Sequence, residues 1–212
     1  MTQMEAFILI GGRSSRLGRD KAFVELGGMT LTERAIANVG NGLPNAKITA
    51  VAGNSAQFAI EAISSDVPFI FDLYEARGPL GGLHAAIASA KSPWIFVLAC
   101  DYPFVSPELI SLLSKKISND HGAVVPEQND GRLQPLCAFY NVATALPIVE
   151  EIVERPRVPP PMHEVVAQMD PRVVKFGEYS HLAGADNCFI NINTEADLIA
   201  ARKITRKLSG PN

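Results

Sequence analysis

The feature that most restricts the fold of this chain is an alternation of short apolar runs with amphipathic stretches over its first 117 residues. Apolar runs of four to six residues are typical of strands that are buried on both faces of a sheet. They occupy residues 7–10, 47–52, 67–71 and 94–99, and we predict helices over 31–39, 56–63, 81–90 and 106–117. This alternation predicts an α/β fold of the Rossmann-like, three-layer type, with a mostly parallel sheet and helices on both faces.

The second half of the chain follows this pattern less regularly. We predict strands over 123–125, 136–140, 172–176 and 188–192, and helices over 141–154, 162–169 and 195–207. The Pro-rich segment 156–161 cannot continue a helix, and it is too short for a linker between domains. We therefore expect a single domain over residues 1–212, with a mobile loop at the Pro-rich segment.

Polar residues follow three of the predicted strands closely: the loop that begins at Gly11, then Asp72, then Asp101. In a parallel sheet, ligands bind in the crevice outside the carboxyl ends of the strands. We therefore expect these three positions to meet in one site at this edge of the sheet.

The loop 11–21 is rich in glycine and in cations. Gly11 and Gly12 let backbone N–H groups approach a ligand closely, while Arg16 offers a bidentate grip on phosphate and Lys21 a point charge. The spacing matches neither the GxxxxGK[ST] pattern of a Walker A loop nor the GxGxxG of a dinucleotide site. We predict that the loop binds the triphosphate of a nucleotide. The alternative is a solvated turn with scattered surface arginines.

Asp101 and Asp72 are the candidate carboxylates of this site. A carboxylate just after an apolar strand is a suitable Mg²⁺ ligand, because magnesium takes one or two carboxylates together with substrate phosphates. Asp101 could instead favour the start of the helix that follows it, and Asp72 could contact nucleotide or metal or cap its own loop. Gly78 and Gly82 of the GPLGG segment offer an approach for a flat base or sugar, or form a turn that starts a helix.

Asn191 and Asn193 alternate with apolar residues near the end of the chain, so both should project to one face of the predicted strand. Two amides on one face near the ligand edge suggest hydrogen bonds to a substrate. The alternative is capping and turn formation, which suffices to explain Thr194.

The overall charge and the cysteines exclude other classes. The net charge is −3, which gives no footprint for nucleic acid or an anionic membrane, and no apolar run reaches the roughly 18 residues that span a bilayer. The three cysteines lack CxxC spacing, which predicts buried reduced thiols and a cytoplasmic location. The four histidines cluster with no cysteine or serine motif, so we assign none a catalytic role.

Five segments in order resemble the MobA family, the molybdenum cofactor guanylyltransferases. They are ILIGGRSSRLGRDK at the start, GPLGGL, ACDYPFVSPEL, GRLQPLCAFY and FININTEADL near the end. Together they extend over nearly the whole chain. The first segment alone is typical of the wider nucleotidyltransferase superfamily, whose fold is described as nucleotide-diphospho-sugar transferase-like.

The resemblance implies transfer of GMP from GTP to molybdopterin carrying molybdenum, with Mg²⁺ as cofactor and release of pyrophosphate. Residues 1–120 would bind GTP and residues 121–207 would contribute the molybdopterin side. The implied residues are Leu9, Ile10, Gly11, Gly12, Lys21, Asp72 and Asp101 for the nucleotide, Arg16, Lys21 and Asp101 for catalysis, Asp101 for the metal, and Gly78, Gly82, Asn191 and Asn193 for the second substrate. Gly11 replaces an alanine of cytidylyl-transferring relatives, which favours a purine, while Ile10 replaces the family's usual alanine.

The partners implied are GTP, Mo-molybdopterin, and molybdenum-insertion and molybdoenzyme-chaperone proteins. Two other functions remain open at this point. One is cytidylyl or sugar-1-phosphate nucleotidyl transfer within the same superfamily. The other is a nucleotide-binding regulatory module without catalysis, against which the presence of both Lys21 and Asp101 argues.

Overall fold

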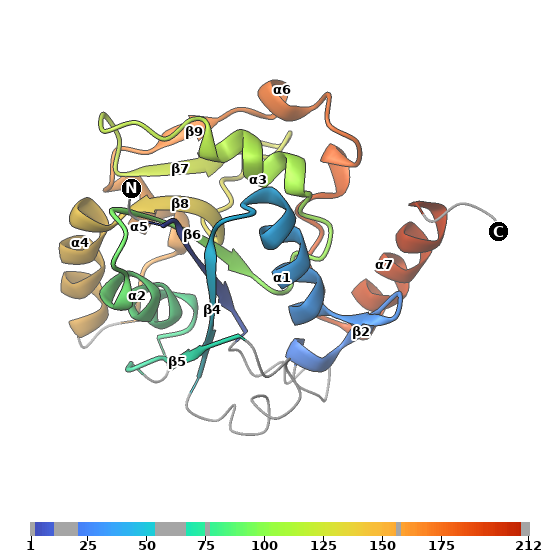
Figure 1. Cartoon of the computed structure of the whole chain (residues 1–212), viewed down its shortest axis with the longest axis horizontal. Helices are drawn as coiled ribbons and strands as arrows, with labels where there is room; N and C mark the ends of the chain where they lie inside the picture. Colours follow the sequence, from blue (N-terminus) through green and yellow to red (C-terminus); the bar gives the residue numbers. More distant parts are fainter. Residues whose placement is uncertain (1–2, 11–20, 54–66, 75–76, 156–157, 209–212) are drawn as a thin grey trace.

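The computed structural model describes residues 3–10, 21–53, 67–74, 77–155 and 158–208. A seven-stranded sheet lies between two layers of helices (Figure 1). In sheet order its strands are β5 (Phe69–Phe71), β4 (Lys47–Ala52), β1 (Glu5–Leu9), β6 (Trp94–Ala99), β8 (Cys137–Asn141), β7 (Ala123–Pro126) and β9 (Arg172–Val174). Strand β8 is antiparallel to β6 and β7, and all other neighbours are parallel. The predicted mostly parallel α/β fold is confirmed.

The central strands are apolar on both faces. Successive residues of a strand point to opposite sides, so Ala6 and Ile8 of β1 pack against one helix layer and Phe7 and Leu9 against the other. Strands β6 and β8 alternate in the same way between the two layers. The sheet is therefore buried on both faces, as the continuous apolar runs predicted.

Two helices with well-formed N-terminal caps cover the first face, α1 (Leu31–Gly42) and α3 (Pro107–Ser114). A capping box starts α1: the Thr30 hydroxyl accepts from the Glu33 N–H at 3.1 Å, and the Glu33 carboxylate accepts from the Thr30 N–H at 2.7 Å. The Ser106 hydroxyl caps α3, with proline at the first helical position. The prediction that Ser106 begins this helix is confirmed.

The opposite face is covered by α2 (Pro79–Ser89), α4 (Val142–Glu154) and α5 (Met162–Ala167), which Figure 1 shows on the other side of the sheet from α1. Their apolar stripes pack on the strands through Leu80, Leu83, Ala86, Ile87, Ala145, Val149, Val153, Val165 and Val166. Helix α4 contains Pro147, whose side chain is exposed. The prediction of a helix that continues through this proline is confirmed.

The remaining elements lie around the first face. They are the 3-10 turn η1 (Lys21–Phe23), a hairpin of β2 (Glu25–Leu26) and β3 (Met29–Thr30), α6 (Phe176–Tyr179), the 3-10 turn η4 (Ala185–Asn187) and the closing helix α7 (Glu195–Leu208). The hairpin turns at Gly27 and Gly28, whose φ angles of 64° and 81° suit glycine. Helix α7 buries Leu198 and Ala201 in the first core, and its end points away from the body (Figure 1).

Some predicted elements were wrong. Residues 188–192 form no strand: the Ile190 N–H donates to Asn187 O and the Cys188 N–H to Ala185 O, so the chain turns there. The helix predicted over 106–117 ends at Ser114, and the strand predicted over 172–176 ends at Val174 because Phe176 already begins α6. The helix predicted over 56–63 lies outside the described residues.

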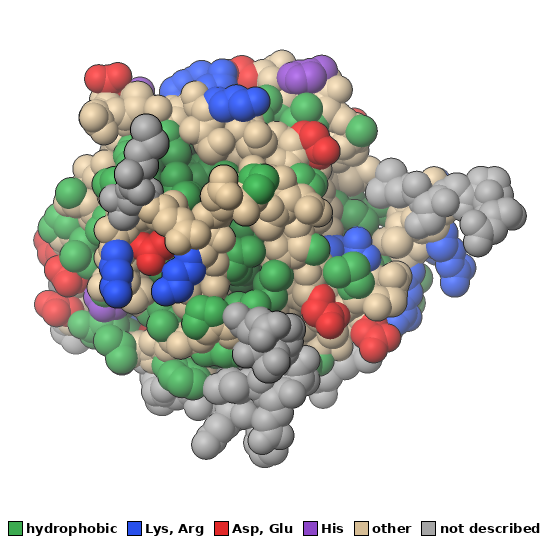
Figure 2. All heavy atoms as spheres, in the orientation of Figure 1, with side chains coloured by type: hydrophobic (Ala, Val, Ile, Leu, Met, Phe, Trp, Pro, Cys, Tyr) green, Lys and Arg blue, Asp and Glu red, His purple; other side chains and the backbone are tan. Residues whose placement is uncertain are grey.

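Helices of the length and apolarity needed to cross a membrane are absent from the described ranges. Figure 2 shows basic side chains spread among acidic ones on the visible face of the molecule. That face carries no single basic patch within the described residues, in keeping with the net charge of −3.

Candidate functional site

Lys21, Asp101 and Asn193 meet at the sheet edge where the parallel strands β1, β4, β5 and β6 end. The Lys21 Nζ lies 3.1 Å from Asp101 Oδ2 and donates to Asn193 Oδ1 at 2.5 Å. The Lys21 and Asp101 side chains are only 18% and 20% exposed, so water screens this ion pair less than one at the surface. Three residues predicted for one site, separated by up to 172 positions, are in contact.

Asp101 reaches this edge because the hydrogen-bond ladder between β1 and β6 continues beyond the strands. The Cys100 N–H donates to Leu9 O at 3.1 Å, which holds the chain in register up to the residue before Asp101. Lys21 arrives from the other side, at the first position of η1 after the cation-rich loop. The site thus lies at the carboxyl ends of the strands, where open α/β sheets bind ligands.

The segment that carries Asn193 is fixed to Asp101 by its backbone. The Ile192 N–H donates to the Asp101 carbonyl at 3.2 Å. At the start of α7, the Asp197 carboxylate accepts from the N–H groups of Asn193 at 3.0 Å and Thr194 at 2.8 Å. The backbone hydrogen bond from Asn193 is the largest of the effects that lower the pKa of Asp197, so this carboxylate stays ionised and holds the segment in place.

Two oxygens of this site, Asp101 Oδ1 and Asn191 Oδ1, are buried and accept no hydrogen bond from the described part of the protein. Buried oxygens are nearly always satisfied, so each of these two can still accept a hydrogen bond from a ligand or coordinate a cation. Carboxylate and amide oxygens suit a hard divalent cation, and Asp101 fits the single protein carboxylate that magnesium takes beside substrate phosphates. No group of three or more His, Cys, Asp or Glu able to hold a metal occurs among the described residues.

Asp72 follows β5 and lies against the N-terminal turn of α2. Its Oδ1 accepts from the Tyr74 N–H at 2.8 Å, and its own N–H donates to Ala52 O at 2.9 Å. A Cβ added to Gly81 would meet Asp72 Oδ2 at 2.3 Å, closer than real contacts allow. Glycine at position 81 therefore lets the Asp72 carboxylate lie directly on the backbone of α2.

Leu9 and Ile10 are buried at the end of β1, with 7% and 1% of the residue exposed. The Leu9 carbonyl and the Ile10 N–H are engaged within the sheet, the latter with Val51 O at 2.9 Å. Ile10 packs in the first core, which gives a structural reason for its large apolar side chain. The predicted contact of these residues with a nucleotide stays a prediction.

The glycines of the second predicted segment have distinct positions. Gly78 precedes α2 with a φ of 57°, and a Cβ on Gly82 would come 3.4 Å from the Leu9 side chain. A role of Gly78 and Gly82 in substrate binding stays a prediction. Gly11, Gly12 and Arg16 lie outside the described residues.

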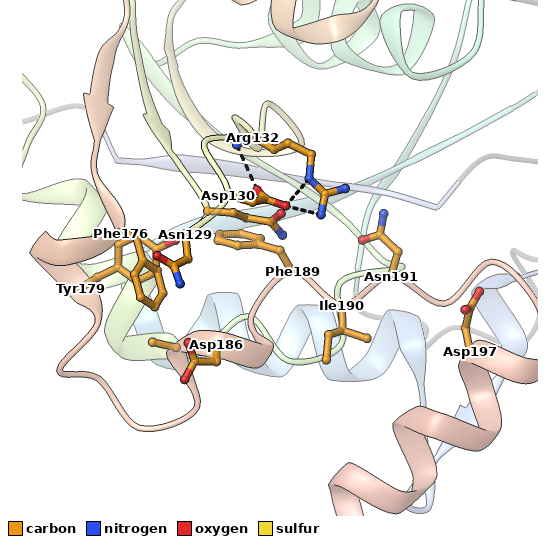
Figure 3. A pocket seen from close by; sticks show the side chains of 12 residues that line it. Asn129, Asp130, Arg132, Phe176, Tyr179, Asp186, Phe189, Ile190, Asn191 and Asp197 are labelled. Atoms are coloured by element: carbon orange, nitrogen blue, oxygen red, sulfur yellow. Dashed lines mark hydrogen bonds and ion pairs between the residues drawn. The ribbon is translucent and has the colours of Figure 1, made fainter.

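Beside Asn191 opens a cavity of about 640 Å³, which we call the aromatic cavity (Figure 3). It is lined by Gln128, Asn129, Asp130, Arg132, Phe176, Tyr179, Ala185, Asp186, Phe189, Ile190, Asn191 and Asp197. Its size is that of a pocket for a small organic ligand. Two of its lining residues, Asn191 and Asp197, also belong to the segment that holds Asn193, so the cavity adjoins the Lys21–Asp101 pair.

Residues of the GRLQP segment are functional candidates that the sequence reasoning missed. Arg132 lines the aromatic cavity, and Gln134 accepts a hydrogen bond from the Tyr102 hydroxyl at 2.9 Å. Burial raises the pKa of the Tyr102 phenol, and the neighbouring Asp101 carboxylate raises it further, so the phenol stays protonated. The available sequence signal for these residues is that GRLQP lies within one of the five segments that resemble the MobA family.

The prediction of buried thiols is confirmed, and His84 also lies in the interior. His84 is 5% exposed and packs edge-on against Tyr74, with ring centroids 4.9 Å apart. All three cysteines are buried, and burial raises the pKa of the Cys137 and Cys188 thiols. Thiols with raised pKa values are poor nucleophiles and metal ligands.

Comparison with known proteins adds the following. The family model for the MobA-like NTP transferase domain matches residues 6–159. A probable molybdenum cofactor guanylyltransferase of Methanosarcina mazei is 34% identical over 203 residues, which are 91% of this chain and 87% of that protein. A protein of the same description from Bacillus cereus is 31% identical over 206 residues, 96% of this chain and 98% of that protein.

The crystal structure of molybdopterin-guanine dinucleotide biosynthesis protein A from Archaeoglobus fulgidus has the same fold. Its TM-score against this chain is 0.76 at 25% sequence identity, with 96% of this chain and 100% of that chain covered. The similarity therefore extends over the sheet and both helix layers.

Proposed function

This chain belongs to the family of MobA-like NTP transferase domains and is a nucleotidyltransferase; from that premise we propose that it transfers GMP from GTP to molybdopterin carrying molybdenum. One observation carries the proposal. Lys21, Asp101 and Asn193 form a partly buried cluster at the ligand edge of the sheet, with one Asp101 oxygen buried and without a hydrogen-bond donor in the described residues. The names of the relatives suggest the guanine nucleotide and the molybdenum cofactor as its substrates.

In the proposed reaction, a terminal phosphate oxygen of molybdopterin attacks the α-phosphorus of GTP. The new P–O bond forms as the bond to the bridging oxygen breaks, and pyrophosphate leaves with the electron pair of that bond. The attacking phosphate is already ionised at neutral pH, so no general base is needed. This is consistent with the absence of a histidine from the Lys21–Asp101 contact.

Lys21 donates to the phosphate oxygens and offsets the charge that develops on them. Asp101 and Asn193 hold its ammonium group at this position. Magnesium fits the Asp101 oxygen that accepts no hydrogen bond from the described residues, and when bound it would neutralise phosphate charge. Asp72 lies against the backbone of Gly81 and accepts a hydrogen bond from the Tyr74 N–H. From this position at the end of β5, it contacts the nucleotide.

The test is a pyrophosphate-release assay with molybdopterin and each of GTP, CTP, UTP and ATP. We expect release with GTP to exceed release with each other nucleotide by at least tenfold. Activity confined to CTP, or activity with a sugar 1-phosphate in place of molybdopterin, would contradict the proposed substrates. Nucleotide binding without any pyrophosphate release would contradict the proposed reaction.

A further inference from the structure

The segment that carries Asn193 belongs to no helix or strand, since α7 begins only at Glu195. Its position therefore depends on contacts with the elements around it. The Ile192 N–H donates to the Asp101 carbonyl at 3.2 Å, which ties the segment to the chain after β6. On the other side of Asn193, the Asp197 carboxylate ties it to the first turn of α7. Asn193 thus lies between two fixed points.

The Asp197 carboxylate does more than start α7. Its Oδ2 accepts from the Thr194 N–H at 2.8 Å while the Thr194 hydroxyl accepts from the Asp197 N–H at 3.2 Å, the reciprocal pattern of a capping box. In the capping box of α1, the Glu33 carboxylate accepts from the N–H and the hydroxyl of Thr30. At α7 the same oxygen reaches one residue further, to the Asn193 N–H at 3.0 Å. A cap does not require this additional hydrogen bond, which fixes the backbone of Asn193.

Asn193 passes this constraint on to Lys21. Its Oδ1 accepts from Lys21 Nζ at 2.5 Å, and the same ammonium lies 3.1 Å from Asp101 Oδ2. A lysine ammonium is a compact charge on a flexible stem, so its position is set by the acceptors around it. Three hydrogen bonds in series therefore link the carboxylate of Asp197 to that of Asp101, through Asn193 and Lys21.

The charge of Asp197 acts in the same direction as its hydrogen bonds. The backbone hydrogen bond from Asn193 is the largest effect that lowers the pKa of Asp197, and the Lys21 ammonium contributes to the same shift. The attraction between the two charges is mutual, so an ionised Asp197 also favours the ammonium in the position observed.

We propose that Asp197 is a positioning residue of the transfer reaction: it fixes Asn193, which in turn holds the Lys21 ammonium where charge develops on the phosphates. The inference rests on the proposed function, and it adds a residue of α7 that sets the geometry of the site. A shift of about 1 Å in a reacting site can cost up to a hundredfold in rate. The alternative is that Asp197 only starts α7, in which case its loss would destabilise the helix and leave the reaction unaffected.

The first test is the steady-state kinetics of pyrophosphate release by Asp197→Ala. We expect kcat to fall about tenfold while the KM for GTP stays within about twofold, because a displaced ammonium is missed most where charge develops in the transition state. Asp197→Asn should restore part of the loss, since its amide oxygen can still accept the Asn193 N–H.

The matched control is Asn141→Ala, which removes the side-chain cap of another helix. The Asn141 amide oxygen accepts from the Thr144 N–H at 3.1 Å at the start of α4. Asn141 pairs with Trp94 at the first residue of β6, so it lies at the edge of the sheet opposite Asp101. Both alanine variants should lower the melting temperature, because each loses a cap. Only Asp197→Ala should lose kcat.

A double variant and a structure separate positioning from a general effect on α7. If Asp197 acts through Asn193, then Asp197→Ala should change kcat by less than about twofold in a protein that already carries Asn193→Ala. In a crystal structure of Asp197→Ala, we expect Asn193 Oδ1 to lie beyond hydrogen-bond distance of Lys21 Nζ while α7 is retained. Normal kcat in Asp197→Ala, an equal loss in Asn141→Ala, a second tenfold loss in the double variant, or an unchanged contact between these two atoms would each overturn the proposal.

Failure of this inference can be told apart from failure of the proposed function. The kinetic comparison uses whichever nucleoside triphosphate the unaltered protein accepts, so activity confined to CTP would contradict the proposed function and leave this test intact. If no nucleotide supports pyrophosphate release, the crystal structure of Asp197→Ala still decides whether Asp197 positions Lys21. If GTP supports release and the contact between Lys21 and Asn193 survives in the variant, the reaction stands and Asp197 serves only α7.

Discussion

Two carboxylates of this protein, Asp101 and Glu178, have similar exposure but different numbers of hydrogen bonds. Their side chains are 20% and 27% exposed, and each pairs with a lysine. Glu178 accepts from Lys116 Nζ at 2.9 Å, from Arg172 Nη2 at 3.0 and 2.8 Å, and from the Lys175 N–H at 3.0 Å. Asp101 pairs with Lys21 through one oxygen, and its other oxygen is buried without a donor from the described residues.

The difference separates a structural carboxylate from the one that we propose contacts the metal and the nucleotide. Glu178 fastens α6 to β9 and to the end of α3, and with both oxygens occupied it has nothing left to offer a ligand. The hydrogen bonds, first of all that from Lys116, lower its pKa to about 2. Asp101 keeps a buried acceptor unused, which costs stability unless a ligand compensates for it. Asp101 therefore differs from Glu178 in its hydrogen bonding rather than in its charge or its exposure.

The largest effect is expected from Asp101→Asn. The variant keeps the shape of the side chain but loses the charge that would hold a metal beside the phosphates, so turnover should fall on the order of 10³-fold. Its melting temperature should fall, because the partly buried Lys21 ammonium loses the charge of its carboxylate partner. Pyrophosphate release and thermal unfolding measure the two quantities.

The matched control is Glu178→Gln, the same change at the satisfied carboxylate. It should keep turnover within twofold while lowering the melting temperature. If Asp101→Asn keeps normal turnover, or if Glu178→Gln loses it at a temperature where the variant is folded, the contrast between the two carboxylates is invalid.

The next effect in size is expected from Lys21→Met. The variant removes the ammonium group that contacts Asp101 and Asn193, and with it the charge offered to the phosphates, so turnover should fall about 10²-fold. Lys116→Met, at the other cluster, should leave turnover unchanged. Steady-state kinetics check both variants, and a loss of turnover of similar size in each would show that the two lysines do not differ in function.

A smaller effect is expected from Gly81→Ala. The added Cβ would come 2.3 Å from Asp72 Oδ2 and must push that carboxylate away from its position beside the nucleotide edge. We expect the KM for GTP to rise about tenfold with little change in kcat, because a displaced carboxylate weakens binding by about 1.4 kcal/mol. Gly40→Ala is the control: it lies in α1, where the nearest atom is 3.9 Å from the added Cβ. A rise in KM in both variants would point to a general effect of the added methyl group.

The smallest effect on activity, with a clear effect on stability, is expected when the pH is lowered until the Glu178 carboxylate is protonated. The pKa of this group lies at about 2 in the folded protein against an ordinary value of 4.5, so its contribution is complete above about pH 5 and is lost as the pH falls toward 2. Glu178→Gln should lower the free energy of unfolding by about 1–2 kcal/mol at pH 7. Urea unfolding at pH 7 and pH 3 measures this. The difference between the two proteins should shrink at pH 3, and a constant difference would show that ionisation of Glu178 is not its source.

The sequence predicted the parts of the fold that depend on local pattern. Strands β4 and β6 have the predicted bounds, because short unbroken apolar runs of this length fit strands that are buried on both faces of a sheet. The direction of β8 could not be predicted, since a buried strand looks the same parallel or antiparallel. The two-residue strands of the β2–β3 hairpin are too short to give a period, and the strand expected over 188–192 is replaced by turns held to Asp101 through the Ile192 N–H.

The candidate site also contains residues that the sequence could predict and residues that it could not. Lys21 and Asp101 could be predicted because each follows a strand of a parallel sheet, and the fold then brings strand ends together. The aromatic cavity could not, because it joins residues 128–132 with residues 176–191 from turns whose geometry leaves no periodic signal. Arg132 has an ordinary sequence context, which does not predict its position between Asp130 and Asn191.

The most direct test of the contrast between the two carboxylates is a crystal structure of the protein with GTP and Mg²⁺. We expect the metal on Asp101 Oδ1, the nucleotide phosphates within hydrogen-bond distance of Lys21 Nζ, and the Glu178 cluster unchanged. A metal and triphosphate bound away from Asp101 and Lys21 would contradict the account.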